Sequence, residues 1–198
     1  MLSYLALGDS YTIGEAVAAE GRWPVRLAAS LRAQGVPLAE PQILATTGWT
    51  TDELSAAMDA ATFEPPYDLV SLLIGVNNQY RGRSADEYRE EFHRLLARAI
   101  ALAGGRPGRV LVLSIPDWSV TPFARDSGRD LARIAAELDE FNAVAQEETA
   151  RAGAAFVDIT PISRAHPALL ADDGLHPSGA QYALWAEAAM LVARQLLG

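Results

Sequence analysis

The stretch YDLVSLLIG, residues 67–75, indicates the fold most clearly. From Leu69 to Ile74 it is apolar except for one serine, and it ends at a glycine. A short, continuous apolar run of this kind is typical of a strand that is buried on both faces, as in a parallel sheet. The stretch GRVLVLSI, residues 108–115, has the same character. Together they predict a parallel sheet that is covered by helices on both sides.

Three further strands are expected on either side of this pair: LSYLALG (2–8), PQILAT (41–46) and GAAFVDI (153–159). Amphipathic stretches separate them. Two of these stretches begin with the spacing of a capping box, at Thr50 with Glu53 and at Ser84 with Glu87. Alternation of strands and helices in this way predicts an α/β chain with a five-stranded parallel sheet.

Two later helices have faces that the sequence predicts. Apolar residues recur at helical spacing after Leu131, and the last helix is expected to begin near Ser178. The buried stripe of the first is predicted to be Ile134, Leu138, Phe141 and Ala145, and that of the second Ala180, Leu184, Ala188 and Leu191.

Composition narrows the class of protein. The 198 residues, expected to form one domain over 1–198, carry a net charge of −9, which disfavours nucleic-acid or anionic-membrane partners. All 16 basic residues are arginine, so the chain has no lysine for a P-loop or a Schiff base. The chain also has no cysteine, which excludes a thiolate nucleophile. No apolar stretch reaches membrane-spanning length, and the first ten residues lack the features of a signal peptide. A cytoplasmic location is the expectation.

Ligands of open parallel sheets bind at the carboxyl ends of the strands, so the loops there are the place to seek a site. These loops are GDSYTIG, TTGWTT, GVNNQYRG, PDWSVTPF and the segment 160–177. The last contains DDGLHPSG, residues 172–179, in which Asp173 precedes His176 by three residues. A carboxylate at that spacing can orient an imidazole and stabilise its cation. His93, on the polar side of its helix, and His166, in a loop, are expected to be surface residues.

The other loops offer the partners that such a histidine needs. Ser10 follows the first strand, Gly48 the second and Asn77 the third. A serine can act as a nucleophile when a base and oxyanion donors accompany it, and a backbone or side-chain N–H can be such a donor. Each residue alone is equally typical of a turn or helix cap.

In this order along the chain, GDS at 8–10, Gly48, GVN at 75–77 and DGLH at 173–176 resemble the SGNH (GDSL-type) hydrolase family. The resemblance implies a three-layer, flavodoxin-like sandwich. It also implies Ser10 as nucleophile, His176 as base and Asp173 as the residue that orients it. The oxyanion hole would be formed by the N–H groups of Ser10 and Gly48 and by the Asn77 side chain.

The resemblance further implies a serine hydrolase that acts on carboxylic esters through an acyl-enzyme, with no metal or cofactor. Its substrate would be a small acyl ester or acylated sugar. Aromatic residues in the same loops are candidates for the substrate pocket: Tyr11, Trp49, Tyr80, Trp118 and Phe123. Arg81 and Arg83 could attract an anionic group. The family commonly has Asp where this chain has Asn78, and the resemblance alone predicts that Asn78→Asp is tolerated.

Other functions are possible on such a sheet. An aspartyl phosphatase would use Asp9, but Tyr11 stands where a second acidic residue is wanted and no lysine is present. A flavodoxin needs a phosphate-binding first loop, and the acidic Asp9 and Glu15 disfavour it. The alternative from another class is a non-catalytic module that binds acyl or carbohydrate ligands on the same fold.

Overall fold

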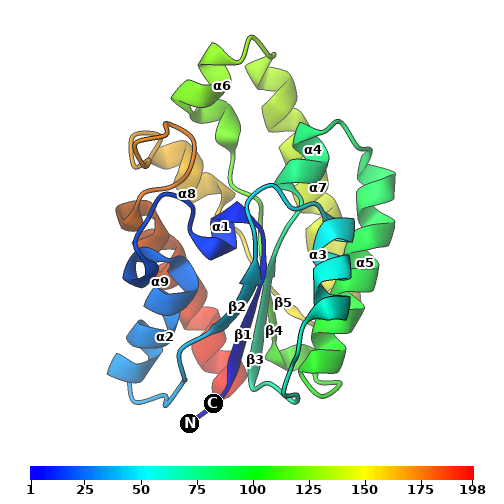
Figure 1. Cartoon of the computed structure of the whole chain (residues 1–198), viewed down its shortest axis with the longest axis vertical. Helices are drawn as coiled ribbons and strands as arrows, with labels where there is room; N and C mark the ends of the chain where they lie inside the picture. Colours follow the sequence, from blue (N-terminus) through cyan, green and yellow to red (C-terminus); the bar gives the residue numbers. More distant parts are fainter.

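The computed structural model describes residues 1–198 and contains a single five-stranded sheet. The strands are β1 (Tyr4–Gly8), β2 (Gln42–Ala45), β3 (Leu69–Leu73), β4 (Val110–Leu113) and β5 (Ala155–Val157). They lie in the order β2-β1-β3-β4-β5, and every neighbouring pair is parallel (Figure 1). The predicted α/β fold with a five-stranded parallel sheet is therefore confirmed.

Each observed strand lies inside its predicted range and is shorter by a few residues. All five residues of β1 and of β3 are buried, as expected for strands with a layer of helices on each face. The flanking residues of the predicted strands belong to caps and turns. Gly75 is the N-cap of a helix, and a 3₁₀ turn (η2, Pro107–Arg109) precedes β4.

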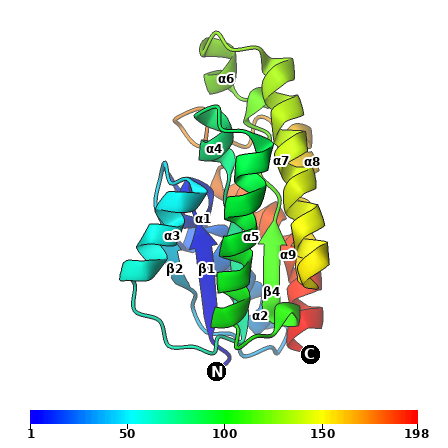
Figure 2. The ribbon, with the colours of Figure 1, turned by 90° about the vertical axis from the view of Figure 1, so that its right-hand side faces the viewer.

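Helices cover both faces of the sheet and form a three-layer sandwich (Figures 1 and 2). On one face α2 (Trp23–Ala33) packs against α9 (Gly179–Leu197). On the other, α5 (Ala85–Leu102) packs against both α3 (Thr51–Ala60) and α7 (Leu131–Ala152). The residues Ile134, Leu138, Phe141 and Ala145 of α7 are all buried, which confirms that stripe.

The buried face of α9 differs from the prediction. Its buried residues are Gln181, Tyr182, Trp185, Ala186, Ala189 and Ala193, whereas Leu191 is 66% exposed and Ala180 is also exposed. Both stripes have helical spacing, and the face with the larger apolar area is the one that packs on the sheet. Tyr182 and Trp185 provide that area and contact each other edge to face. The start at Ser178 is confirmed, since this residue is the N-cap.

Short helices gather at the carboxyl edge of the sheet. They are α1 (Ser10–Ile13), α4 (Val76–Tyr80), α6 (Pro122–Asp126) and α8 (Thr160–Ala165), with the 3₁₀ turn η3 (Trp118–Val120) before α6. In Figure 2 the arrowheads of β1 and β4 point toward this end, and α6 lies beyond it. Another 3₁₀ turn, η1 (Ala19–Gly21), leads into α2. The two chain termini lie at the opposite end of the molecule (Figure 1).

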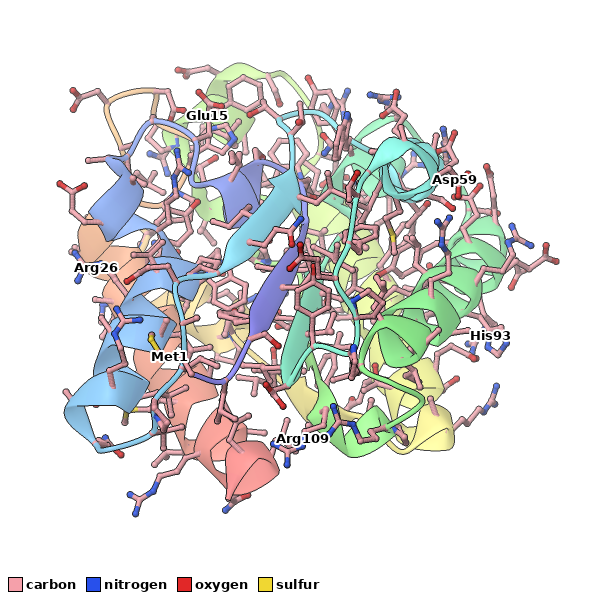
Figure 3. The ribbon with its side chains drawn as sticks, turned by 60° about the horizontal axis from the view of Figure 1, so that its bottom comes forward. Met1, Glu15, Arg26, Asp59, His93 and Arg109 are labelled. Carbon is pink, nitrogen blue, oxygen red and sulfur yellow. The ribbon has the colours of Figure 1, made fainter.

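Apolar side chains fill the space between the sheet and its helices. Forty-four buried residues form one hydrophobic cluster, with Trp23 and Trp185 among the largest side chains. Most charged side chains lie on the outside, as the labelled Asp59 shows (Figure 3), whereas Asp9, Asp117 and Glu148 are buried. None of the helices has both the length and the hydropathy that a membrane span requires.

Candidate active site

Ser10 lies at the turn between β1 and α1, where the backbone of the sheet ends. Asp9 caps α1 by accepting the Tyr11 N–H at 3.0 Å, and Ser10 is the first residue of the helix. The turn requires glycine at position 8. A Cβ there would lie 2.3 Å from Thr12 Oγ1 and 2.5 Å from the Leu73 carbonyl oxygen. The first loop therefore holds Ser10 close to the sheet, and Ser10 is 4% exposed.

His176 and Asp173 form a hydrogen-bonded pair in the loop before α9. His176 Nδ1 lies 2.6 Å from Asp173 Oδ2, while Asp173 Oδ1 accepts the backbone N–H groups of Leu175 and His176 at 2.9 Å each. An ionised Asp173 accepts the Nδ1 proton, so the neutral imidazole keeps Nε2 free to accept a proton. This is the arrangement that a histidine base needs.

The ionised form of Asp173 is favoured by its surroundings. Partial burial by itself would raise the pKa of Asp173, but the hydrogen bonds from His176 and from the two backbone N–H groups outweigh it. The pKa of Asp173 is consequently lowered from its ordinary value. Asp173 is thus set to remain an acceptor for His176 across the neutral range.

Backbone contacts hold the loop that carries this pair. The Ala171 N–H donates to the His176 carbonyl at 2.8 Å, and the Phe123 N–H of α6 donates to the Gly174 carbonyl at 3.1 Å. The ring of Tyr11 contacts the His176 imidazole edge to face, with centroids 5.8 Å apart. His176 is therefore fixed by its own loop, by α6 and by the first turn of α1.

Ser10 and His176 line one cavity of about 140 Å³ at the carboxyl edge of the sheet. No hydrogen bond joins the two side chains in this structure, although catalytic contacts of this type commonly tighten when substrate binds. Most of the lining surface is apolar, and the lining residues come from five loops: Ser10, Tyr11, Thr47, Gly48, Val76, Asn77, Tyr80, Trp118, Phe123, Leu175 and His176.

Gly48 and Asn77 reach this cavity from the loops after β2 and β3, the strands on either side of β1. Gly48 has φ +89°, a conformation that favours glycine, and no atom lies within 4 Å of the place where its Cβ would be. The Asn77 Nδ2 donates one hydrogen bond to the Trp49 carbonyl at 2.8 Å. Because an amide NH₂ has two hydrogens, this bond fixes the group and leaves its second N–H for a ligand.

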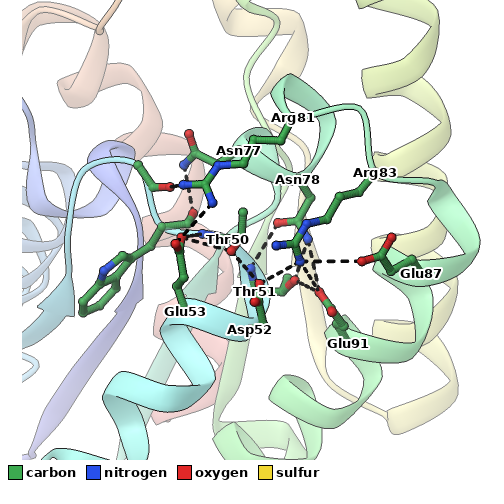
Figure 4. Close-up of polar contacts among 12 residues, drawn as sticks. Thr50, Thr51, Asp52, Glu53, Asn77, Asn78, Arg81, Arg83, Glu87 and Glu91 are labelled. Atoms are coloured by element: carbon green, nitrogen blue, oxygen red, sulfur yellow. Dashed lines mark hydrogen bonds and ion pairs between the residues drawn. The ribbon is translucent and has the colours of Figure 1, made fainter.

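Asn78 points to a different place. Its buried amide accepts the Thr51 N–H at 3.1 Å and donates to Thr51 Oγ1 at 2.6 Å and to Glu91 Oε2 at 3.2 Å (Figure 4). The two asparagines follow the third strand, and in the structure they lie in α4, where successive side chains diverge by about 100°. They separate for this reason, with Asn77 at the cavity and Asn78 in the structure behind it.

Aromatic rings form one wall of the cavity. Trp118 lies between Tyr80 and Phe123, with ring centroids 5.5 and 6.1 Å away. Its indole N–H donates to Gln79 Oε1 at 2.9 Å, and the Arg129 guanidinium stacks 4.1 Å above the Tyr80 ring. Hydrogen bonding and stacking thus hold this wall in a defined position.

The structure brings most of the predicted residues together. Of the aromatic candidates, Tyr11, Tyr80, Trp118 and Phe123 line the cavity, while Trp49 does not. The Trp49 side chain is half-buried against the core, and its carbonyl serves Asn77 instead. His93 is 68% exposed and pairs with Glu148, and His166 is exposed at the end of α8.

Three residues that line the cavity are not predicted from the sequence: Thr47, Val76 and Leu175. Each is the immediate neighbour of a predicted site residue, namely Gly48, Asn77 and His176. That adjacency is the signal that could identify them. The two arginines also differ from the suggested role, because Arg81 and Arg83 are engaged by carboxylates of the protein itself.

The GDSL-like Lipase/Acylhydrolase family model matches residues 6–184, which is most of the chain. The chain therefore belongs to the GDSL-like lipase/acylhydrolase family. No curated protein matches it significantly in sequence.

Several solved structures have the same fold as this chain but a low sequence identity to it. Axe2, an acetylxylan esterase from Geobacillus stearothermophilus, is 20% identical, with a TM-score of 0.76 over 97% of this chain and 94% of the other. A lipase/acylhydrolase from Enterococcus faecalis is 22% identical, with a TM-score of 0.72 over 99% and 96%. The esterase EstA from Pseudoalteromonas sp. is 16% identical, with a TM-score of 0.75 over 100% and 99%. At these identities the likeness extends to the fold.

Proposed function

We propose that the protein is a carboxylic ester hydrolase whose nucleophile is Ser10, with His176 as base and Asp173 as the residue that orients it. The observation that carries the proposal is the Asp173–His176 hydrogen bond of 2.6 Å at a cavity that Ser10 also lines. Membership of the lipase/acylhydrolase family supports the same reaction class. Ser10 N–H, Gly48 N–H and the free Asn77 N–H are the proposed oxyanion donors.

In the proposed reaction, His176 Nε2 takes the Ser10 hydroxyl proton as Oγ attacks the ester carbonyl carbon. The oxyanion donors stabilise the charge on the carbonyl oxygen, and His176 then returns the proton to the departing alcohol. Water attacks the resulting acyl-enzyme with His176 again as base, which releases the acid and restores Ser10. Asp173 stabilises the imidazolium in both steps.

The cavity limits the acyl group that this site can accept. An apolar cavity of about 150 Å³ can hold one molecule of the size of benzene. The cavity here has a volume of about 140 Å³ and a mostly apolar lining. The substrate class that fits is an ester of a short acyl chain with a small alcohol or sugar, as in the acetylxylan esterase of similar fold.

The test is the hydrolysis of p-nitrophenyl acetate, butyrate and octanoate. We expect kcat/KM for acetate and butyrate to exceed that for octanoate by about tenfold or more, since a cavity of about 140 Å³ suits a short acyl chain. Ser10→Ala should abolish the reaction with all esters. A preference for octanoate would contradict the proposed substrate class, and equal rates for wild type and Ser10→Ala would contradict the proposed function.

A further inference from the structure

In the loop between β2 and α3, Gly48 makes no contact through a side chain of its own. Gly48 has no side chain, and nothing lies within 4 Å of its Cβ position. Within the loop, the Trp49 N–H makes a long hydrogen bond of 3.3 Å to the Thr46 carbonyl. No side chain packs at Gly48 itself. Its position therefore depends on its neighbours, the Trp49 side chain against the core and the Thr47 hydroxyl bonded to Glu15, and on hydrogen bonds to its own backbone.

Arg81, just after α4, supplies such a bond. Its Nη2 donates to the Gly48 carbonyl at 2.7 Å, and its Nη1 donates to Glu53 Oε1 at 3.2 Å (Figure 4). The other oxygen of Glu53 accepts the Thr50 N–H at 2.9 Å. One guanidinium thus joins Gly48 to the first turn of α3, and the planar fork of arginine suits two acceptors held side by side.

Charge favours this arrangement. Hydrogen bonds, first from the Thr50 backbone and also from Arg81, lower the pKa of Glu53 despite its partial burial. Glu53 is therefore anionic at neutral pH and holds the guanidinium beside Gly48. Both side chains are substantially exposed, 45% for Arg81 and 40% for Glu53, so their ion pair contributes little to global stability.

We propose that Arg81 is a positioning residue for the oxyanion hole. By holding the Gly48 carbonyl it restrains the backbone of Gly48, and with it the N–H group of this residue, relative to Ser10 and Asn77. It acts together with Asn77, whose amide holds the next carbonyl of the same loop, that of Trp49. Asn77 lies in the first turn of α4 and Arg81 is the C-cap of the same helix, and the Arg81 N–H donates to the Asn77 carbonyl at 3.0 Å. The two contacts therefore belong to one rigid turn, so Gly48 and Asn77 keep a constant spacing. This inference rests on the proposed ester hydrolysis, since it concerns the geometry in which the oxyanion is bound.

The experiment compares Arg81→Met, Arg81→Lys and the control Arg133→Met on p-nitrophenyl acetate. Arg133 is also an exposed arginine with a carboxylate partner, Glu137, and it contacts no part of the Gly48 loop. For Arg81→Met we expect kcat to fall by about 10- to 100-fold with KM within about twofold, because misplaced donors act mainly on the transition state. Arg81→Lys should recover part of kcat, because an ammonium can still reach one carbonyl.

Two physical measurements separate positioning from unfolding. Arg81→Met should change Tm by no more than about 3 °C. Deuterium uptake of residues 46–53, measured by mass spectrometry, should rise in Arg81→Met and not in Arg133→Met. An unchanged kcat in Arg81→Met, equal losses in both variants, or a kcat loss that follows a large fall in Tm would overturn the inference.

The same experiment distinguishes this inference from the proposed function. If wild type hydrolyses the ester and Ser10→Ala does not, the kinetics decide the role of Arg81. If wild type shows no hydrolysis at all, the proposed function fails. In that case, increased deuterium uptake of residues 46–53 in Arg81→Met still supports the inference that Arg81 holds this loop in place. Unchanged uptake overturns that inference.

Discussion

At the scale of single residues, Asn78 shows how a departure from the family pattern is accommodated. The amide is fully buried and donates to Glu91 Oε2, which also accepts the Thr51 hydroxyl and lies 3.4 Å from Arg83 Nη1 (Figure 4). Glu91, from α5, thus supplies the carboxylate of this buried group. An aspartate at position 78 would add a second carboxylate where the structure has a donor.

Asn78→Asp is therefore expected to be destabilising, in contrast to the tolerance that the resemblance alone predicts. Losing the donor and facing Glu91 should cost on the order of 1–3 kcal/mol of unfolding free energy at pH 7. Adding Glu91→Gln should recover most of the loss, because a glutamine amide can donate to the new carboxylate. Urea unfolding of both single variants and the double variant measures the coupling. A stable Asn78→Asp protein with no coupling to position 91 would contradict this account.

At the scale of elements, the strands and long helices could be predicted because their apolar patterns are strong. The runs at 67–75 and 108–115 each contain a strand of the sheet, and the stripe of α7 is buried as expected. The short helix α4 could not be predicted in this way. It has five residues, too few to show a period, and its N-cap, Gly75, has φ +132° and is packed closely against Tyr88 and Ile115.

The same limit applies to the candidate site. Residue types and their order along the chain pointed to Ser10, Gly48, Asn77, Asp173 and His176, and all but Asp173 line one cavity. Asp173 joins through its bond to His176. A contact such as that of the Arg81 side chain with the Gly48 carbonyl joins residues that are 33 positions apart, and no sequence pattern records it.

At the scale of the whole molecule, stability is linked to pH through Asp9. This carboxyl is completely buried, and only one of its oxygens has a hydrogen-bond partner. Burial raises its pKa to about 7, and the bond from the Tyr11 N–H opposes only part of that rise. Because the folded protein holds a proton that the unfolded chain has lost, stability from this group falls as pH rises from about 4 to about 7.

Asp9→Asn should remove this dependence, since an amide does not titrate. The unfolding free energy of the variant relative to wild type should therefore rise between pH 5 and pH 7 and level off above, with a slope on the order of 1.4 kcal/mol per pH unit in that window, and its relative Tm should rise in parallel. Asp172→Asn, at an exposed carboxylate, is the matched control and should show no such trend. A difference in Tm that stays constant with pH would count against a protonated Asp9.

The central claim is that Ser10 is a nucleophile activated by His176, and covalent labelling tests it directly. The protein would be treated with an alkyl fluorophosphonate at neutral pH, and its intact mass would be followed over time. The account predicts a single adduct on Ser10, none in Ser10→Ala, and labelling at least about 10³-fold slower in His176→Ala but unchanged in His93→Ala and His166→Ala. An adduct on another residue, or labelling of Ser10 at the same rate without His176, would contradict it.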